Sequence, residues 1–132
     1  MIAAERALLG GWRSGELAVT HEDNAEGPDQ LTVAEGLGLV GPRVEVHAAR
    51  WGTVPRLVAA ISEGLVAAGI ALDENTVLIL DPAADVDGNS ATGSTGAAGS
   101  APVRPAGAGH LWWVRRGARG AATVTCRPAG GR

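Results

Sequence analysis

The sequence predicts an α/β fold, a single layered domain in which a mixed, mostly parallel sheet is flanked by helices. Its 132 residues are enough for one domain with a buried core. A β-branched run at residues 43–47 is followed by an amphipathic segment at 53–69 and an apolar run at 75–80. This strand–helix–strand order favours a right-handed crossover that joins two parallel strands.

The N-terminal part is expected to contain two helices and a short strand. Residues 2–12 place aliphatic side chains among good helix formers and stop at a Gly-Gly pair. Residues 16–20 (ELAVT) follow a Ser-Gly turn and are typical of a short strand. A second helix is predicted over residues 30–37, because Asp29 is a good N-cap and Gly38 stands just beyond the end.

The central helix, residues 53–69, is the best-supported element. Its apolar side chains recur at helical spacing on one face, and Thr53 is a suitable N-cap. Pro55 falls in the first turn, where its missing N–H costs little. The following run, NTVLIL at residues 75–80, predicts a strand that is buried on both faces.

The chain divides into an α/β core at residues 1–82, a flexible insert at 83–108 and a C-terminal hairpin at 109–132. The insert consists largely of Gly, Ala, Ser, Thr and Pro, and buries too little apolar surface to offset its ordering entropy. Residues 110–115 and 121–127 are predicted to be the two strands of the hairpin, which completes the sheet.

Charge is distributed unevenly along the chain. All 14 acidic residues lie at or before Asp87, whereas residues 88–132 carry six Arg and no acid. Such a basic segment can bind an acidic partner or the acidic part of its own chain.

One cysteine, Cys126, excludes an internal disulfide and a cysteine-rich metal site. With no signal peptide and no long apolar run, the protein is expected to be cytoplasmic, without a membrane partner. The Ala- and Gly-rich composition also fits a truncated or misframed reading frame.

Several segments resemble the N-terminal half of the thiolase fold, as found in the β-ketoacyl-acyl-carrier-protein synthases. The matching residues, in family order, are Gly41-Pro42, Val44, Val46, Ala48-Ala49, Gly52, Ala59-Ala60, Val77–Leu80 and Gly120–Val124. The resemblance implies half of a thiolase-like fold, and a dimeric assembly that serves fatty-acid or polyketide biosynthesis.

The corner of this motif, Ala49, Arg50, Trp51 and Gly52, lacks the nucleophile of the family. Arg50 stands where the resemblance implies a catalytic cysteine, and a guanidinium is always protonated and a poor nucleophile. Cys126 lies in a terminal strand and cannot replace it. We therefore expect a degenerate corner, with no catalytic residue, no cofactor and no bound metal.

Together these features predict a degenerate β-ketoacyl synthase-like protein that is non-catalytic alone. It would act as an accessory or pairing subunit, in a homo- or hetero-oligomer with a synthase-like subunit, and an acyl-carrier protein is a candidate partner. One alternative is a small α/β interaction or regulatory module unrelated to acyl transfer. Another is an acyltransferase whose missing residues come from a partner chain.

Two further polar features have structural explanations. His47, just before the corner, could act as a base but is more typical of a strand histidine with a satisfied ring. Oxygen-bearing side chains after the apolar run suggest a calcium loop, but the glycine is misplaced and no bidentate Glu follows, so a polar loop is expected. These side chains are Asp81, Asp85, Asp87 and Asn89.

The segment GHLWWVRRGARG indicates an interaction surface. Trp112 and Trp113 are followed by Arg115 and Arg116, so large aromatic side chains and basic charge occur together. Single-stranded nucleic acid is recognised by the same combination, but the rest of the chain is acidic. Nucleic acid is therefore not expected as the partner.

Overall fold

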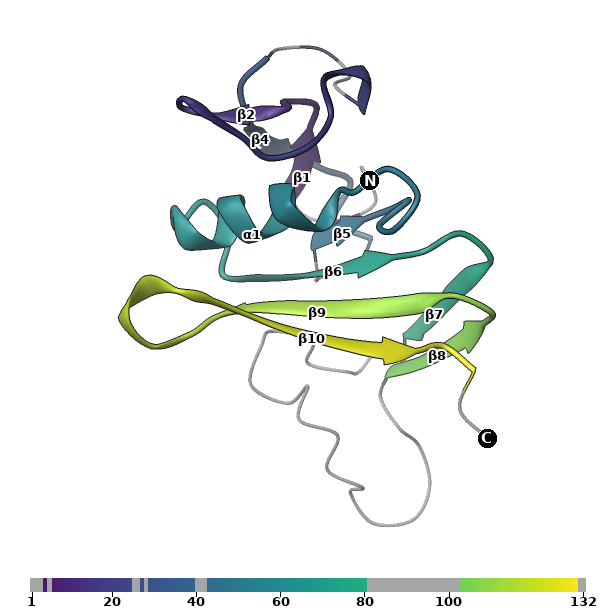
Figure 1. Ribbon diagram of the computed structural model, residues 1–132. Helices are drawn as coiled ribbons and strands as arrows, with labels where there is room; N and C mark the ends of the chain where they lie inside the picture. The colour runs from purple at the N-terminus through teal and green to yellow at the C-terminus, as the bar shows by residue number, and fades with distance from the viewer. Residues whose placement is uncertain are drawn as a thin grey trace.

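The computed structural model describes residues 4, 6–24, 27, 29–39, 43–80 and 103–130. These residues form a mostly β structure with a single α-helix (Figure 1). The helices and strands are β1 (Arg6–Leu9), β2 (Arg13–Ser14), β3 (Leu17–Ala18), η1 (Glu22–Asn24), β4 (Thr32–Glu35), β5 (Arg43–Glu45), α1 (Val54–Ser62), β6 (Ala68–Leu72), β7 (Thr76–Leu80), β8 (Val103–Gly107), β9 (His110–Arg116), η2 (Ala118–Gly120) and β10 (Ala122–Pro128).

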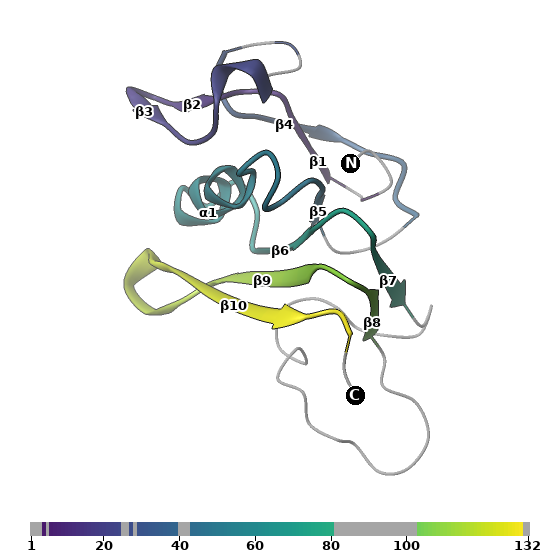
Figure 2. The same cartoon turned by 45° about the vertical axis from the view of Figure 1, so that its right-hand side comes forward.

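The main sheet has four strands in the order β10-β9-β6-β5. Strands β5 and β6 are parallel and are joined through α1, while the β6–β9 and β9–β10 pairs are antiparallel. Helix α1 packs on one face of this sheet, and β10 lies at its outer edge beyond β9 (Figure 2). The prediction of a helix-flanked, mostly parallel sheet is therefore wrong. Of the three strand pairs in the main sheet only β5–β6 is parallel, and among the described residues a single α-helix covers one face of the sheet.

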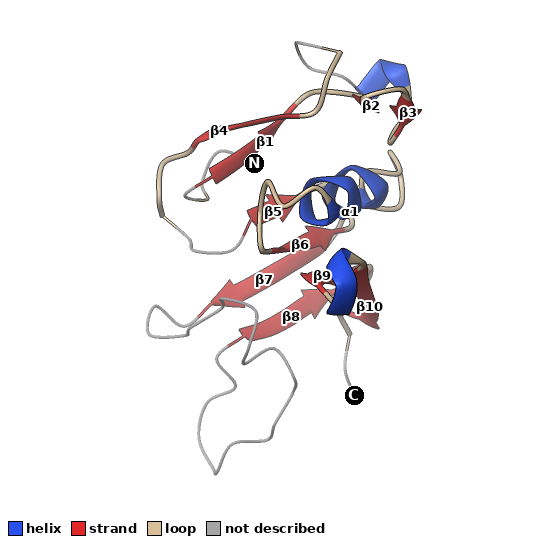
Figure 3. Cartoon of the chain, turned by 90° about the vertical axis from the view of Figure 1, so that its left-hand side faces the viewer, coloured by secondary structure: helices blue, strands red, loops and turns tan. Residues whose placement is uncertain are grey.

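Three smaller antiparallel ribbons surround the main sheet. They pair β1 with β4, β2 with β3, and β7 with β8. Figure 3 shows the β1–β4 and β7–β8 ribbons as separate from the main sheet. The small, mainly antiparallel sheets also contradict the architecture of half a thiolase-like fold.

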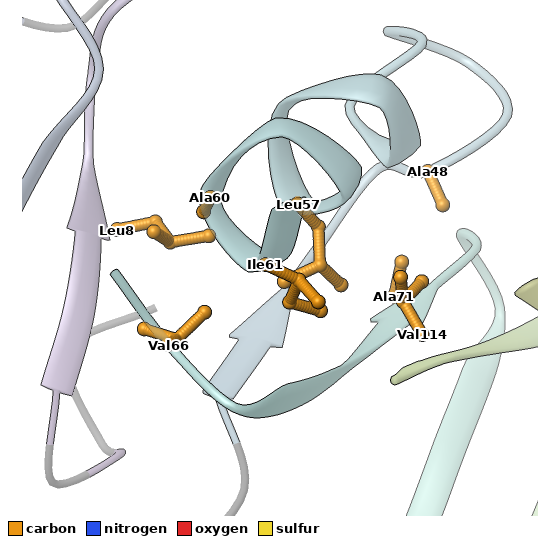
Figure 4. Close-up of a cluster of buried hydrophobic side chains, with 8 residues drawn as sticks. All are labelled: Leu8, Ala48, Leu57, Ala60, Ile61, Val66, Ala71 and Val114. Carbon is orange, nitrogen blue, oxygen red and sulfur yellow. The ribbon is translucent and has the colours of Figure 1, made fainter. Parts of the chain in front are cut away.

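The main core lies between α1 and the sheet (Figure 4). Leu57 and Ile61 of α1 are fully buried, and they pack with Val114 of β9 and Leu8 of β1. The complete buried set is Leu8, Ala48, Leu57, Ala60, Ile61, Val66, Ala71 and Val114. Since side chains alternate along a strand, the second cluster occupies the other face of the sheet. It consists of Val44, Ile70, Leu72 and Leu111.

The helices predicted at residues 2–12 and 30–37 are instead the strands β1 and β4. They pair with each other, with Leu8 opposite Val33, although β2, β3 and η1 lie between them in the sequence. Both segments contain helix-forming residues, but as a strand β1 pairs with β4 and buries Leu8 in the main core. A long-range pairing therefore overrides a weak local propensity.

The crossover from β5 returns to β6, not to residues 75–80. Helix α1 ends at Ser62 because Gly64 follows it with φ +78°, a conformation that favours glycine. The released chain then forms β6 as the parallel partner of β5. Strand β7 does form over Thr76–Leu80, but it pairs with β8 and its side chains are alternately exposed, not buried on both faces. Strand β8 lies inside the predicted insert, and residues 81–102 lie outside the described residues.

The hairpin expected near the C-terminus is confirmed. Strand β9 runs from His110 to Arg116 and pairs over its full length with β10. The strand predicted from residue 43 is also confirmed, as β5, and the central helix is confirmed in its N-terminal part.

Candidate functional site

The corner between β5 and α1 is a closed turn. The Trp51 N–H donates to the His47 carbonyl over 2.9 Å, and the Thr53 N–H donates to Ala48 over 3.2 Å. Gly52 has φ +62°, which a glycine adopts without strain, while His47 adopts φ +60°. Thr53 does not cap the helix with its side chain; its hydroxyl donates to the Val46 carbonyl over 3.0 Å.

Three backbone N–H groups at this corner, those of Ala49, Trp51 and Thr53, are hydrogen-bonded. The Ala49 N–H donates to Asp73 Oδ1 over 2.8 Å, and the other two are bonded within the turn. Arg50 is exposed at the position where the resemblance implies a nucleophile. The Arg50 guanidinium stays protonated and is a poor nucleophile.

The β6–β7 turn supplies two carboxylates that organise the corner. Glu74 Oε1 lies 2.9 Å from His47 Nδ1, and the His47 ring lies against Trp51 with the ring centroids 4.2 Å apart. Asp73 Oδ2 accepts the backbone N–H of His110 over 3.0 Å, so one carboxylate joins the corner to the start of β9. Within the described ranges, no group of three or more His, Cys, Asp or Glu residues could hold a metal ion.

Sequence reasoning did not identify Asp73 and Glu74. The available signal was the short polar turn DEN between two apolar runs, a position where carboxylates bind the backbone of neighbouring segments. The suggested calcium-loop residues Asp81, Asp85, Asp87 and Asn89 lie outside the described residues.

Cys126 is an exposed thiol on β10. Desolvation raises its pKa, and the negative charge of Asp73 raises it further. Both effects disfavour the thiolate, which is the nucleophilic form. The thiol is therefore not activated for covalent catalysis.

The predicted interaction surface is divided between two faces of β9. Trp112 packs against the helix-side core, and Trp113 packs against the second cluster. Arg116 donates to the Ser62 carbonyl over 3.2 Å and so satisfies the last turn of α1, while Arg115 is half-buried on the opposite face. The two tryptophans cannot act together as one aromatic platform.

Strand β10 offers a different kind of binding surface, an unpaired strand edge. Gly117 donates to the Ala121 carbonyl over 2.6 Å, and Ala129 donates to Gly109 over 2.8 Å, at the two ends of the β9–β10 ladder. Because hydrogen-bonded pairs alternate along an antiparallel ladder, the odd-numbered residues of β10 bond to β9. The N–H and C=O groups of Ala122, Val124 and Cys126 therefore point away from the sheet, and we call them the open edge.

No partner strand covers the open edge within the described part of the chain. Val124, at its centre, keeps 45% of its surface exposed. Pro128 falls where its missing N–H would also have faced outward, so it ends the edge without breaking the ladder.

No known family model matches the chain, and a search of curated proteins also found no match. No helix in the described ranges has the length and apolar character needed to span a membrane.

Proposed function

We propose that this protein is a non-catalytic interaction module that binds an extended segment of a partner as an added strand on β10. The open edge carries the proposal, because three alternate residues of β10 point their N–H and C=O groups away from β9, and no strand in the described ranges pairs with them. Each hydrogen bond formed there contributes about 0.5–1.5 kcal/mol net. A segment that pairs with all three residues therefore gains several such bonds, together with contact on Val124.

The rest of the sheet holds β10 in the geometry that binding requires. Seven residues of β10 pair with β9, and β9 is anchored by buried Leu111 and Val114. A preformed template reduces the ordering cost to that of the incoming segment alone. The length and position of β10 thus favour strand addition over binding at the closed corner.

Pairing with a ketoacyl synthase in fatty-acid or polyketide biosynthesis stays a prediction. Its motivation was the sequence around Ala48–Gly52, and in that corner the N–H groups of Ala48, Ala49 and Trp51 are hydrogen-bonded within the chain. The open edge supports the alternative, an interaction module unrelated to acyl transfer.

Selection from a displayed library of short random peptides, followed by amide hydrogen exchange, tests the proposal. In the free protein, the amides of Ala122, Val124 and Cys126 should exchange faster than those of Thr123 and Thr125, which bond to β9. Bound peptide should slow the first group selectively. Failure to select any peptide, or protection confined to another surface, would refute strand addition.

A matched pair of variants isolates the backbone contribution. Val124→Pro removes one outward N–H but no bond to β9, and proline is tolerated at a sheet edge. Val124→Ala shortens the same side chain and keeps the N–H. We expect the proline variant to bind at least tenfold more weakly than the alanine variant, with unchanged exchange protection in α1 as the control for folding.

A further inference from the structure

The sequence of β10 is close to self-complementary about its centre. Residues 122–126 read ATVTC, so a threonine stands on each side of Val124. When two such segments run antiparallel about a two-fold axis, the central residue lies opposite its own counterpart, and residues equally spaced from the centre lie opposite each other. Val124 then faces Val124 of a second copy, and Thr123 faces Thr125 of that copy. Similar side chains therefore meet at the axis and on both sides of it.

The backbone of the open edge fits the same arrangement. In an antiparallel ladder, a hydrogen-bonded pair forms where both residues point their N–H and C=O groups toward the neighbouring strand. A centre at Val124 places Ala122 opposite Cys126 of the second copy, and these are the outward-facing residues of the open edge. Each copy therefore satisfies every open backbone group of the other.

Neighbouring registers use the open edge less completely. A centre at Thr125 places Ala122 opposite Pro128, which has no N–H to donate. A centre at Thr123 places the last residue of the open edge opposite Gly120, which belongs to the turn η2 and not to the strand. The ends of β10 thus favour the register centred on Val124.

The side chains on the two faces of β10 are also compatible with this register. Val124 pairs with Val114 on the face covered by α1, and contact with its counterpart would cover apolar surface that is 45% exposed. The threonines lie on the opposite face, and pairs of β-branched residues across strands stabilise a sheet. Arg127 lies opposite Ala121 of the second copy, so no two arginines are directly opposed.

We infer that the strand added to the open edge is β10 of a second copy of this chain. This inference rests on the proposed strand addition and names its partner. The product is a two-fold dimer with one continuous sheet in the order β5-β6-β9-β10-β10-β9-β6-β5. The same few residues supply both sides of the contact, and pairing removes the exposed edge. Since the contact is one strand wide, the dimer exchanges with the monomer and forms as protein concentration rises.

Disulfide trapping tests the register directly. At the two-fold axis the Cα atoms of a hydrogen-bonded pair lie about 5.5 Å apart, within the span of a disulfide. Val124→Cys, combined with Cys126→Ala, should therefore give a covalent dimer under mild oxidation. In wild-type protein the two Cys126 residues lie about 13 Å apart along the strands, so the thiols should not cross-link.

The matched control is Leu17→Cys in the same Cys126→Ala background. Leu17 is 67% exposed on β3, in another sheet, and reports cross-linking by random collision. We expect at least about tenfold faster cross-linking at position 124 than at position 17. Equal rates at the two positions would overturn the inferred register.

Sedimentation and amide exchange, measured over a range of protein concentrations, separate this inference from the proposed function. The amides of Ala122, Val124 and Cys126 should exchange at least about tenfold more slowly in concentrated than in dilute wild-type protein, and Val124→Pro should abolish this change. A selected peptide should dissociate the dimer, because both use the same backbone groups.

The possible results are distinct. A protein that stays monomeric at millimolar concentration, but protects the Val124 amide when a selected peptide binds, would overturn self-pairing and leave strand addition intact. A dimer that shows no protection along β10 would also overturn self-pairing. A monomer that binds no peptide would overturn both proposals.

Discussion

Arg56→Met is the sharpest test of how the helix is held on the sheet. Arg56 Nη2 donates to Glu45 Oε2 over 2.7 Å, and Arg56 Nη1 donates to the Gly10 carbonyl over 3.2 Å. The side chains of Arg56 and Glu45 are only 11% and 2% exposed. The pair therefore joins α1, β5 and the segment after β1 beneath the surface.

Removal of Arg56 leaves a buried carboxylate without its cation. Breaking a buried pair from one side costs about 3–5 kcal/mol, and methionine retains most of the aliphatic volume of arginine. Glu45→Gln acts differently, because the amide oxygen can still accept from Arg56 while the buried negative charge is lost. Burial raises the pKa of Glu45, and the opposing effect of the Arg56 guanidinium is smaller. Desolvation of Glu45 thus outweighs its attraction to Arg56, and we expect Glu45→Gln to cost less than Arg56→Met at neutral pH.

The pH dependence of the free energy of unfolding follows from the raised pKa of Glu45. As pH rises, the unfolded carboxyl loses its proton first, near 4.5, while the folded one keeps its proton to higher pH. The folded state then binds more protons than the unfolded state. The contribution of Glu45 to the free energy of unfolding therefore falls as pH rises between the unfolded and folded pKa values. Glu45→Gln should remove this pH-dependent contribution to the free energy of unfolding, because glutamine does not titrate.

Urea unfolding followed by tryptophan fluorescence, on both sides of that pH window, measures these free energies for the wild type and both variants. If Arg56→Met cost less than about 1 kcal/mol at neutral pH, the pair would not be the buried one described. If Glu45→Gln were as destabilising as Arg56→Met, the conclusion that desolvation outweighs the Arg56 charge at Glu45 would be wrong.

The remaining predictions concern the core and the turn that holds the corner. Leu57→Ala should lower the free energy of unfolding by about 2–5 kcal/mol in urea unfolding, because its fully buried side chain leaves a cavity under α1. Asp73→Asn should lower it by about 1–2 kcal/mol, since one amide oxygen cannot replace both acceptors used by Ala49 and His110. The same variant should speed alkylation of Cys126 by iodoacetamide, because loss of the nearby negative charge lowers the thiol pKa; an unchanged rate would contradict the role of Asp73.

Local signals predicted the elements whose partners are close in the chain. The β9–β10 hairpin needs only a short turn between its strands, so residues 110–127 were sufficient to identify it. The start of α1 was equally local, since the apolar spacing and the proline both lie within its own turns.

The candidate site was predicted only in part. The corner at Ala49–Gly52 was predicted between a strand and a helix and lies between β5 and α1, but the Asp73 carboxylate that accepts the Ala49 N–H comes from 24 residues away. The Trp112 and Trp113 pair indicated a surface, whereas strand alternation placed the two rings on opposite faces.

The residues alone predict the charge asymmetry, an arginine at the corner, and the hairpin that provides the open edge. Each of these depends on residue identity or on contacts between near neighbours. The folded chain shows three features that local patterns did not predict: residues 6–9 and 32–35 pair as strands, β6 is the parallel partner of β5, and β10 lies at the edge of the main sheet. Those outcomes depend on which distant segments bury their apolar faces together, and no local propensity is large enough to determine that choice.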